Sequence, residues 1–119
     1  MGTYTEFYIM PVKSAKLDAY RRFAEESGKA WRKHGALSVA EFIADDAKPG
    51  TQTSFPQSVK LEPDEVVAVA VITFPSLEDR ARIKDAVMQD PVFANMTPNT
   101  VPVDGKRMFW GGFTTLISA

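Results

Sequence analysis

The stretch SAKLDAYRRFAEESGKAWRKHG, residues 14–35, predicts the first helix and the layer that the rest of the chain must cover. At 100° per residue, one side collects small and aromatic side chains: Leu17, Tyr20, Phe23, Ala24, Ser27, Gly28, Trp31 and His34. The opposite side carries charged residues throughout. Ser14 is the expected N-cap and Gly35 the expected stop. An aromatic stripe of this kind must pack on another surface, and a β-sheet is the expected one.

Outward from this helix, the remaining apolar patterns predict four strands and a second helix. The strands are expected at residues 3–12, 37–44, 66–74 and 106–118, with Pro11 closing the first. The second helix is expected to begin after Ser76, with Asp79 at the capping-box position, and to end before Pro91. Phe93 and Met96 are expected in a short turn on the core. In the last strand, Gly111-Gly112 indicates a bulge or a close backbone approach.

The resulting order, β-α-β then a long loop then β-α-β, predicts an α+β fold: a ferredoxin-like four-stranded antiparallel sheet. Two helices cover only one face of such a sheet. The run VVAVAVITF at residues 66–74 is nevertheless apolar on both faces. A large exposed apolar face requires a cover. We therefore expect a homodimer through the helix-free face.

The segment 45–65 is long for a connection inside a compact domain, and such loops are often binding loops, lids or oligomer arms. Its centre places Phe55 where loops usually carry polar residues. Two alternatives are open: Phe55 packs on the core, or it contacts a ligand.

Composition excludes several classes of protein. A chain of 119 residues with 45% hydrophobic residues is expected to form a single domain, residues 1–119. A net charge of −1 without a basic run gives no reason to expect nucleic acid as a partner. Cysteine is absent, which excludes disulfides and thiolate chemistry. No signal peptide or membrane-length apolar run is evident, so a cytoplasmic protein without a membrane partner is expected.

Distinctive motifs give the chain a resemblance to a known family. They are WRKHGAL at 31–37, DD at 45–46, TSFPQSVKL at 53–61, FPS at 74–76 and DGKRMFWGGF at 104–113. With these motifs the chain resembles the YbaA-like family of small uncharacterised proteins. The resemblance implies the dimeric α+β barrel fold, in which two ferredoxin-like sheets pack face to face. That superfamily includes cofactor-free monooxygenases, haem-degrading monooxygenases, muconolactone isomerase-type enzymes and stress-response proteins. The family itself has no established reaction, so the resemblance leaves activity open.

Two residues are the first candidates for acid–base chemistry. His34, the single histidine, is either a general base or a haem or metal ligand, or else a packed imidazole bonded to a nearby carbonyl. Glu41 shares a strand face with Val39 and Ile43. Burial there would raise its pKa, whereas a position on an edge strand would let it reach solvent or a basic partner. Glu6, between Tyr4 and Tyr8 on its own face, raises the same question.

Basic residues give further candidates. Arg80 and Lys84 lie within the apolar arc of the second helix. They either extend across the apolar surface to solvent, or Arg80 binds a carboxylate (Glu41, Asp104 or one from a partner subunit) or an anionic ligand. The sequence Asp104-Gly105-Lys106-Arg107 is either a turn leading into a strand or a small anion site. We expect at least one of Glu41 and Arg80 to meet an opposite charge.

The chain lacks a phosphate-binding glycine loop, a Ser-His-Asp arrangement and metal-ligand spacing, so neither a metal nor another cofactor is expected. Three functions remain. The first is a dimer that binds a small apolar or aromatic metabolite in the barrel interior. The second is a cofactor-independent monooxygenase or isomerase acting on an aromatic substrate, and the third is a purely structural interaction module. An open cavity lined by Tyr20, Trp31 or Glu41 would favour the first two, and a shifted carboxylate inside it would favour the enzyme.

Overall fold

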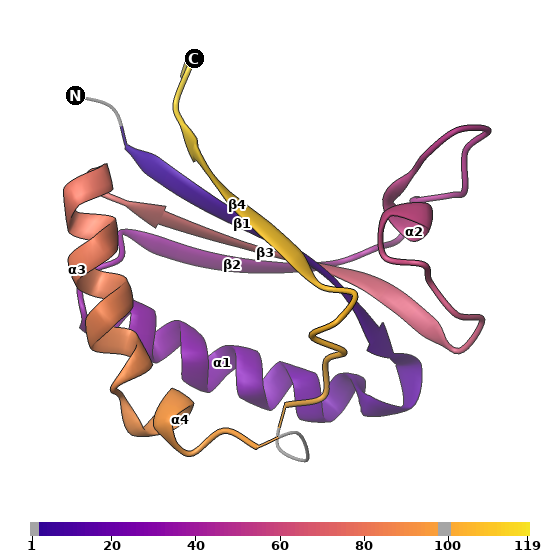
Figure 1. Cartoon of the computed structure of the whole chain (residues 1–119), viewed down its shortest axis with the longest axis horizontal. Coiled ribbons are helices and arrows are strands. Elements are labelled where there is room, and N and C mark those ends of the chain that lie inside the picture. Colours follow the sequence, from indigo (N-terminus) through magenta and orange to yellow (C-terminus); the bar gives the residue numbers. More distant parts are fainter. Residues whose placement is uncertain (1–2, 98–100) are drawn as a thin grey trace.

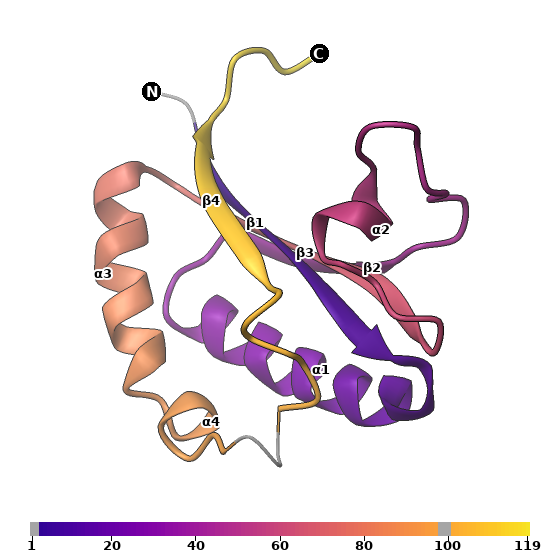
Figure 2. The same cartoon turned by 45° about the vertical axis from the view of Figure 1, so that its right-hand side comes forward.

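A computed structural model describes residues 3–97 and 101–119 (Figures 1 and 2). The elements follow the predicted order: β1 (Tyr4–Lys13), a 3₁₀ turn (Ser14–Lys16), α1 (Leu17–Lys33), β2 (Ser38–Ile43), α2 (Phe55–Ser58), β3 (Glu65–Phe74), α3 (Leu77–Met88), α4 (Pro91–Ala94) and β4 (Phe109–Thr114). The strands form one antiparallel sheet in the order β2-β3-β1-β4. This is the predicted ferredoxin-like α+β arrangement.

The long helices lie on one side of the sheet (Figure 1). Register places Glu6, Tyr8 and Met10 of β1 opposite Ile72, Ala70 and Ala68 of β3. These positions face α1 and α3, because Glu6 binds side chains of α3 and Met10 contacts Tyr20 of α1. Even-numbered residues of β1 and β3 therefore form the helix-facing side of the sheet.

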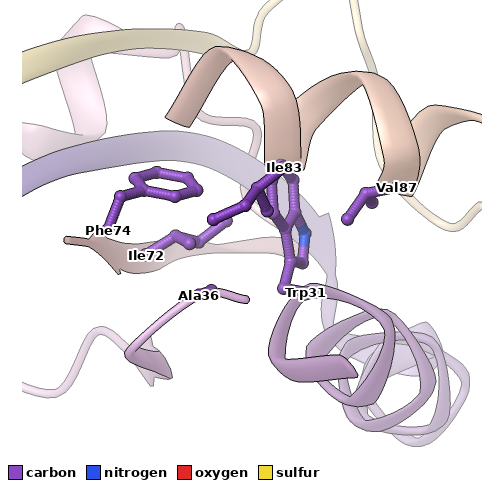
Figure 3. Packing of buried hydrophobic residues seen from close by; sticks show 6 residues of the cluster. All are labelled: Trp31, Ala36, Ile72, Phe74, Ile83 and Val87. Carbon is purple, nitrogen blue, oxygen red and sulfur yellow. The ribbon is translucent and has the colours of Figure 1, made fainter. Parts of the chain in front are cut away.

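The main core cluster fills the space between α1, α3 and β3 (Figure 3). Trp31 extends from the end of α1 toward α3 and makes an edge contact with Phe74, with ring centroids 5.7 Å apart. Its indole is buried beside Ile83 and Val87. The predicted stripe of α1 is thus correct, and Trp31 is its principal packing residue.

The sequence predicted the C-terminal end of α1 correctly but not its N-terminal cap. Gly35 has φ = 120°, a conformation that favours glycine, and the helix ends before it as predicted. The prediction that Ser14 caps the helix is wrong. Ser14 begins a 3₁₀ turn, and α1 starts after Lys16 without a side-chain cap. At α3, by contrast, Ser76 accepts a hydrogen bond from the backbone N–H of Asp79 as predicted.

Two strands, β1 and β4, have boundaries that differ from the predicted ones. Pro11 does not close β1 but lies buried within it. The β1–β4 pairing ends at Ile9 and Phe109, so one edge of β1 is open at Pro11, which makes a proline compatible with the strand. β4 begins later than predicted because residues 104–107 form a turn, and it ends at Thr114, earlier than predicted. Gly112 permits a close approach: a Cβ there would overlap the Tyr4 ring, and the continuous register excludes a bulge.

The long connection between β2 and β3 contains α2, which is capped by Ser54. Buried Val59 follows it and packs with Ile9 and Val67 on the side of the sheet opposite α1. Phe55 is 54% exposed, so the alternative in which it packs on the core is wrong.

The remainder of this helix-free face exposes four phenylalanine side chains: Phe7, Phe42, Phe109 and Phe113. Phe7 and Phe113 make an edge contact across β1 and β4, with ring centroids 5.3 Å apart. The sheet therefore has one face covered by helices and one that is largely bare and aromatic. Within the described residues, none of the helices has the length and apolar character needed to cross a membrane.

Candidate functional site

A cavity of about 530 Å³ lies between the helix-facing side of the sheet and α1, α3 and α4. The residues around it are Tyr8, Met10, Tyr20, Phe23, Ser27, Trp31, Glu41, Ala70, Ile72, Lys84, Met88, Phe93, Met96, Val101, Val103, Gly105, Met108 and Trp110. Most are apolar, and four are methionines. A larger hollow of about 1100 Å³ runs along α1 and β2 as an open groove, and it shares Tyr20 and Glu41 with the cavity.

Strand alternation and residue size together create this space. Tyr8, Ala70 and Trp110 are neighbours on β1, β3 and β4 and face the helices. Ala70 is the small residue of the row, so the middle of the sheet leaves room beneath α1 and α3. The segment before β4 passes beside α1 in both views and closes another side, where Val103 and Met108 pack near Tyr20 (Figure 2).

The first polar feature of the cavity is the pair formed by Tyr20 and Glu41. The buried Tyr20 hydroxyl donates a hydrogen bond to Oε1 of Glu41. Burial raises the pKa of Glu41, and the hydrogen bond from Tyr20 opposes that shift. Burial, and then the neighbouring carboxylate, raise the pKa of Tyr20. Glu41 is also exposed to solvent at the open edge of β2. The two alternatives for Glu41, burial with a raised pKa and access to solvent from an edge strand, are therefore both partly correct.

The second polar feature is a cluster around Glu6, whose side chain is 0% exposed. Arg80 Nε donates to Glu6 Oε2 at 2.6 Å, and Lys84 Nζ donates to the same oxygen at 3.1 Å. The Tyr8 hydroxyl donates to Oε1 at 2.7 Å. Burial and the hydrogen bond to Glu6 raise the pKa of Tyr8. The expectation that at least one of Glu41 and Arg80 meets an opposite charge is confirmed for Arg80, but its partner is Glu6 and neither Glu41 nor Asp104.

Lys84 connects this cluster to the cavity. Its Nζ lies 3.5 Å from the centroid of the Trp110 ring, which itself stacks on Tyr8 with centroids 5.7 Å apart. Arg80 lies over the same Trp110 ring at 5.6 Å but is not among the residues around the cavity. The cluster thus presents one ammonium group, on an aromatic support, to the cavity.

The predicted turn at residues 104–107 belongs to a separate ion-pair network. Arg107 donates two hydrogen bonds of 2.7 Å to Glu65 and one of 2.8 Å to Asp104. The hydrogen bonds from Arg107 lower the pKa of Glu65 to about 2 and lower that of Asp104. Because Arg107 is engaged with these carboxylates, the network connects the start of β3 to the segment before β4. The expected turn at residues 104–107 is present, and Lys106 within it is exposed.

His34 has a comparable structural contact. Its Nε2 lies 3.0 Å from Oδ2 of Asp90. The other carboxylate oxygen of Asp90, Oδ1, accepts a hydrogen bond from the backbone N–H of Val92 and so caps α4. The hydrogen bond to His34 lowers the pKa of Asp90. The expected carbonyl partner is wrong: a carboxylate takes its place. Across residues 3–97 and 101–119, no three histidine, aspartate or glutamate side chains come together as a metal site requires.

The structure therefore brings together Tyr20, Trp31 and Glu41 of the predicted residues, and places His34, Phe55, Asp104, Lys106 and Arg107 elsewhere. Sequence reasoning did not assign Tyr8, Lys84 and Trp110 to this site. The signal for Lys84 was present, since a lysine within an apolar helix arc needs a partner or a path to solvent. Glu41 faces the helices, so the cavity lies within one chain instead of in a barrel interior between two sheets.

Residues 3–105 match the family described as "Protein of unknown function (DUF1428)". The chain belongs to this family. It is 35% identical over 114 residues to the uncharacterized protein YbaA of Escherichia coli K12 and to that of Shigella flexneri, covering 96% of this chain and 97% of each relative. The resemblance to the YbaA-like family is thereby confirmed.

Similar solved structures support the fold. A NIPSNAP family protein of unknown function from Agrobacterium tumefaciens matches with a TM-score of 0.61 at 17% identity, over 96% of this chain and 88% of that one. A dimeric ferredoxin-like protein from an uncultured marine organism matches with 0.61 at 9% identity, over the full length of both. A mutant of SnoaB, a cofactor-independent oxygenase from Streptomyces nogalater, matches with 0.62 at 12% identity, over 99% and 97%.

The Glu6 cluster gives a stability prediction. Replacing Arg80 and Lys84 together with methionine leaves a buried carboxylate with only the Tyr8 hydroxyl. We expect a loss of about 3–5 kcal/mol in the free energy of unfolding, measured by urea denaturation. Each single replacement should cost less than half of this, because one cation remains. Adding Glu6→Gln to the double variant should recover much of the loss. Strictly additive single losses without that recovery would contradict the role given to Glu6.

Proposed function

We propose that this protein binds a small apolar or aromatic molecule in the cavity between the sheet, α1 and α3. The observation that carries the proposal is the cavity itself, a largely apolar space that also holds the Tyr20–Glu41 pair and Lys84. Ligand sites are usually concave and mainly apolar with a few polar groups, and range over roughly 300–1,000 Å³. The volume of about 530 Å³ lies within that range. A purely structural module has no need of such a space.

Filling the cavity tests this proposal. Ala70 is buried in the middle of the sheet and contributes to the cavity, so Ala70→Phe should occupy the space. We expect wild-type protein to bind the neutral probe 2-naphthamide, detected by quenching of tryptophan fluorescence, and Ala70→Phe to bind it at least tenfold more weakly.

The matched control is Ala81→Phe, which adds the same ring on the exposed side of α3 and should leave binding unchanged. Thermal unfolding establishes that both variants fold. Failure of wild-type protein to bind the probe, or equal binding by folded Ala70→Phe, would contradict the proposal.

We further propose that the protein is a homodimer through the helix-free sheet face. The four exposed phenylalanines of that face support this, because a contiguous apolar surface on a monomer usually marks an interface. The likeness to a dimeric ferredoxin-like protein adds support at the level of fold. A lasting interface should bury more than about 1,000 Å² in total.

Light scattering at micromolar concentration tests the dimer. The wild type should have twice the mass of one chain, and Phe113→Asp should shift it to the monomer mass, because the charge would be buried in an apolar interface. Leu77→Asp is the matched control: Leu77 is also exposed, at 51%, but lies on α3, so the dimer should persist. A monomeric wild type would end this proposal.

A second candidate function is a cofactor-independent oxygenase acting on an electron-rich aromatic substrate. The Tyr20–Glu41 pair favours it, since a carboxyl with a raised pKa beside an apolar cavity suits proton abstraction from an acidic aromatic hydroxyl. The fold is shared with SnoaB. In this reaction Glu41 accepts the proton of the substrate hydroxyl.

Oxygen uptake with dihydroxynaphthalenes, above the rate without protein, tests the enzyme. Glu41 must be ionised to accept a proton, so the rate should fall as pH falls through its raised pKa. Glu41→Gln should abolish the reaction. Tyr20→Phe removes a hydrogen bond that lowers this pKa, so it should move the inflection to higher pH. Undiminished uptake by Glu41→Gln would exclude the assigned base.

A further inference from the structure

We propose that the molecule bound in the cavity is an aromatic acid and that Lys84 binds its carboxylate. The inference rests on the proposed ligand-binding function and specifies the chemical class of the ligand. It follows from the charge balance of the Glu6 cluster, from the position of the ammonium group and from the shape of the surrounding side chains.

The Glu6 cluster has one more positive than negative charge. Glu6 supplies a single carboxylate, whereas Arg80 and Lys84 supply two cations. Both carboxylate oxygens already accept hydrogen bonds, Oε2 from the two cations and Oε1 from Tyr8. Aromatic faces under the cations attract them but carry no net charge. One positive charge in this partly buried cluster is therefore without a counter-ion from its own members.

That charge is located on the cavity side. Arg80 directs its Nε and Nη2 toward Glu6, whereas Lys84 is the one of these two cations that lies among the residues around the cavity. An ammonium group has three N–H donors. Within the described part of the chain, Glu6 is the hydrogen-bond acceptor that Lys84 reaches, which leaves donors for a bound anion.

The surroundings of Lys84 favour a flat ring attached to that anion. Its Nζ stands over the Trp110 ring, and Trp110 stacks on Tyr8 with an interplanar angle of 19°. Phe23 and Phe93 add aromatic surface on the helix side of the cavity. The ligand ring packs against Phe23 and Phe93, and its carboxylate, which lies close to the ring plane, meets the Lys84 ammonium group.

Glu41 sets the orientation of such a ligand. It lies on β2 and Trp110 on β4, the two outer strands of the sheet, so the acidic and basic groups flank the cavity from opposite edges. A carboxylate is repelled by Glu41 and attracted by Lys84. The acid group of the ligand therefore points toward β4 and α3, and its ring toward α1 and β2.

A matched pair of probes tests the inference. 2-Naphthoate and 2-naphthamide have nearly the same shape and differ in charge, and their affinities can be compared by fluorescence titration and calorimetry. We expect wild-type protein to bind the naphthoate about tenfold more tightly, the effect of one charged hydrogen bond at a partly exposed site.

Lys84→Met should remove this preference, so that the two probes bind the variant with equal affinity, while Arg80 and Tyr8 still satisfy Glu6. Lys84→Arg should retain it. Lys48→Met, which removes an exposed lysine in the loop after β2, is the control and should behave as wild type.

Three results would contradict the inference, its assignment to Lys84 or the proposed function. Equal affinities of the two probes for wild type would overturn the aromatic-acid inference and leave the proposed cavity function standing. A preference for naphthoate that persists in Lys84→Met would overturn the role of Lys84. Binding of neither probe would overturn the proposed function and this inference with it.

Discussion

The structure depends on a carboxylate that lies where water does not reach. Glu6 is on β1, a central strand, facing the helices, and a lone charge there would cost several kcal/mol. α3 makes this position tolerable by presenting Arg80 and Lys84, one turn apart, toward the sheet. That requirement fixes how α3 is rotated, and the same rotation buries Ile83 and Val87 against Trp31. The weak amphipathic pattern of α3 has this physical reason: its basic residues serve the interior.

The sequence predicted most of the fold because its strongest patterns are local. The stripe on α1, the apolar run of β3 and the N-cap at Ser76 each follow from spacing within one element, and each is present in the structure. Boundaries were less predictable where tertiary pairing decides them. β4 begins at Phe109 instead of residue 106, because the Arg107 ion pairs hold the preceding turn. Pro11 remains in β1 because, among the residues that the structure describes, the pairing with β4 ends at Ile9.

The candidate site was harder to predict because it depends on which elements meet. Alternation showed that Glu6 and Glu41 share faces with apolar residues, and helical spacing showed the same for Arg80. Neither pattern shows which residues of β1 and α3 meet in the fold. Glu6 and Arg80 are 74 residues apart in sequence, so the partner of Arg80 was misassigned. The alternation of side chains along a strand distinguishes its two faces, but it does not show which face the helices cover. The cavity was accordingly expected between two sheets, whereas Tyr20 and Glu41 meet beneath α1 within one chain.

The cavity also contains four of the five methionines in the chain: Met10, Met88, Met96 and Met108. A methionine side chain is unbranched, has three rotatable bonds and carries a polarisable sulfur, so it adapts to neighbours of different outline at small cost. Walls built from such side chains have no single fixed contour. Under the proposed function, an occupant would shape part of its own surroundings, and the polar groups would contribute much of the selectivity. The vulnerability of the cavity is oxidation, because conversion of these thioethers to sulfoxides would make an apolar lining polar.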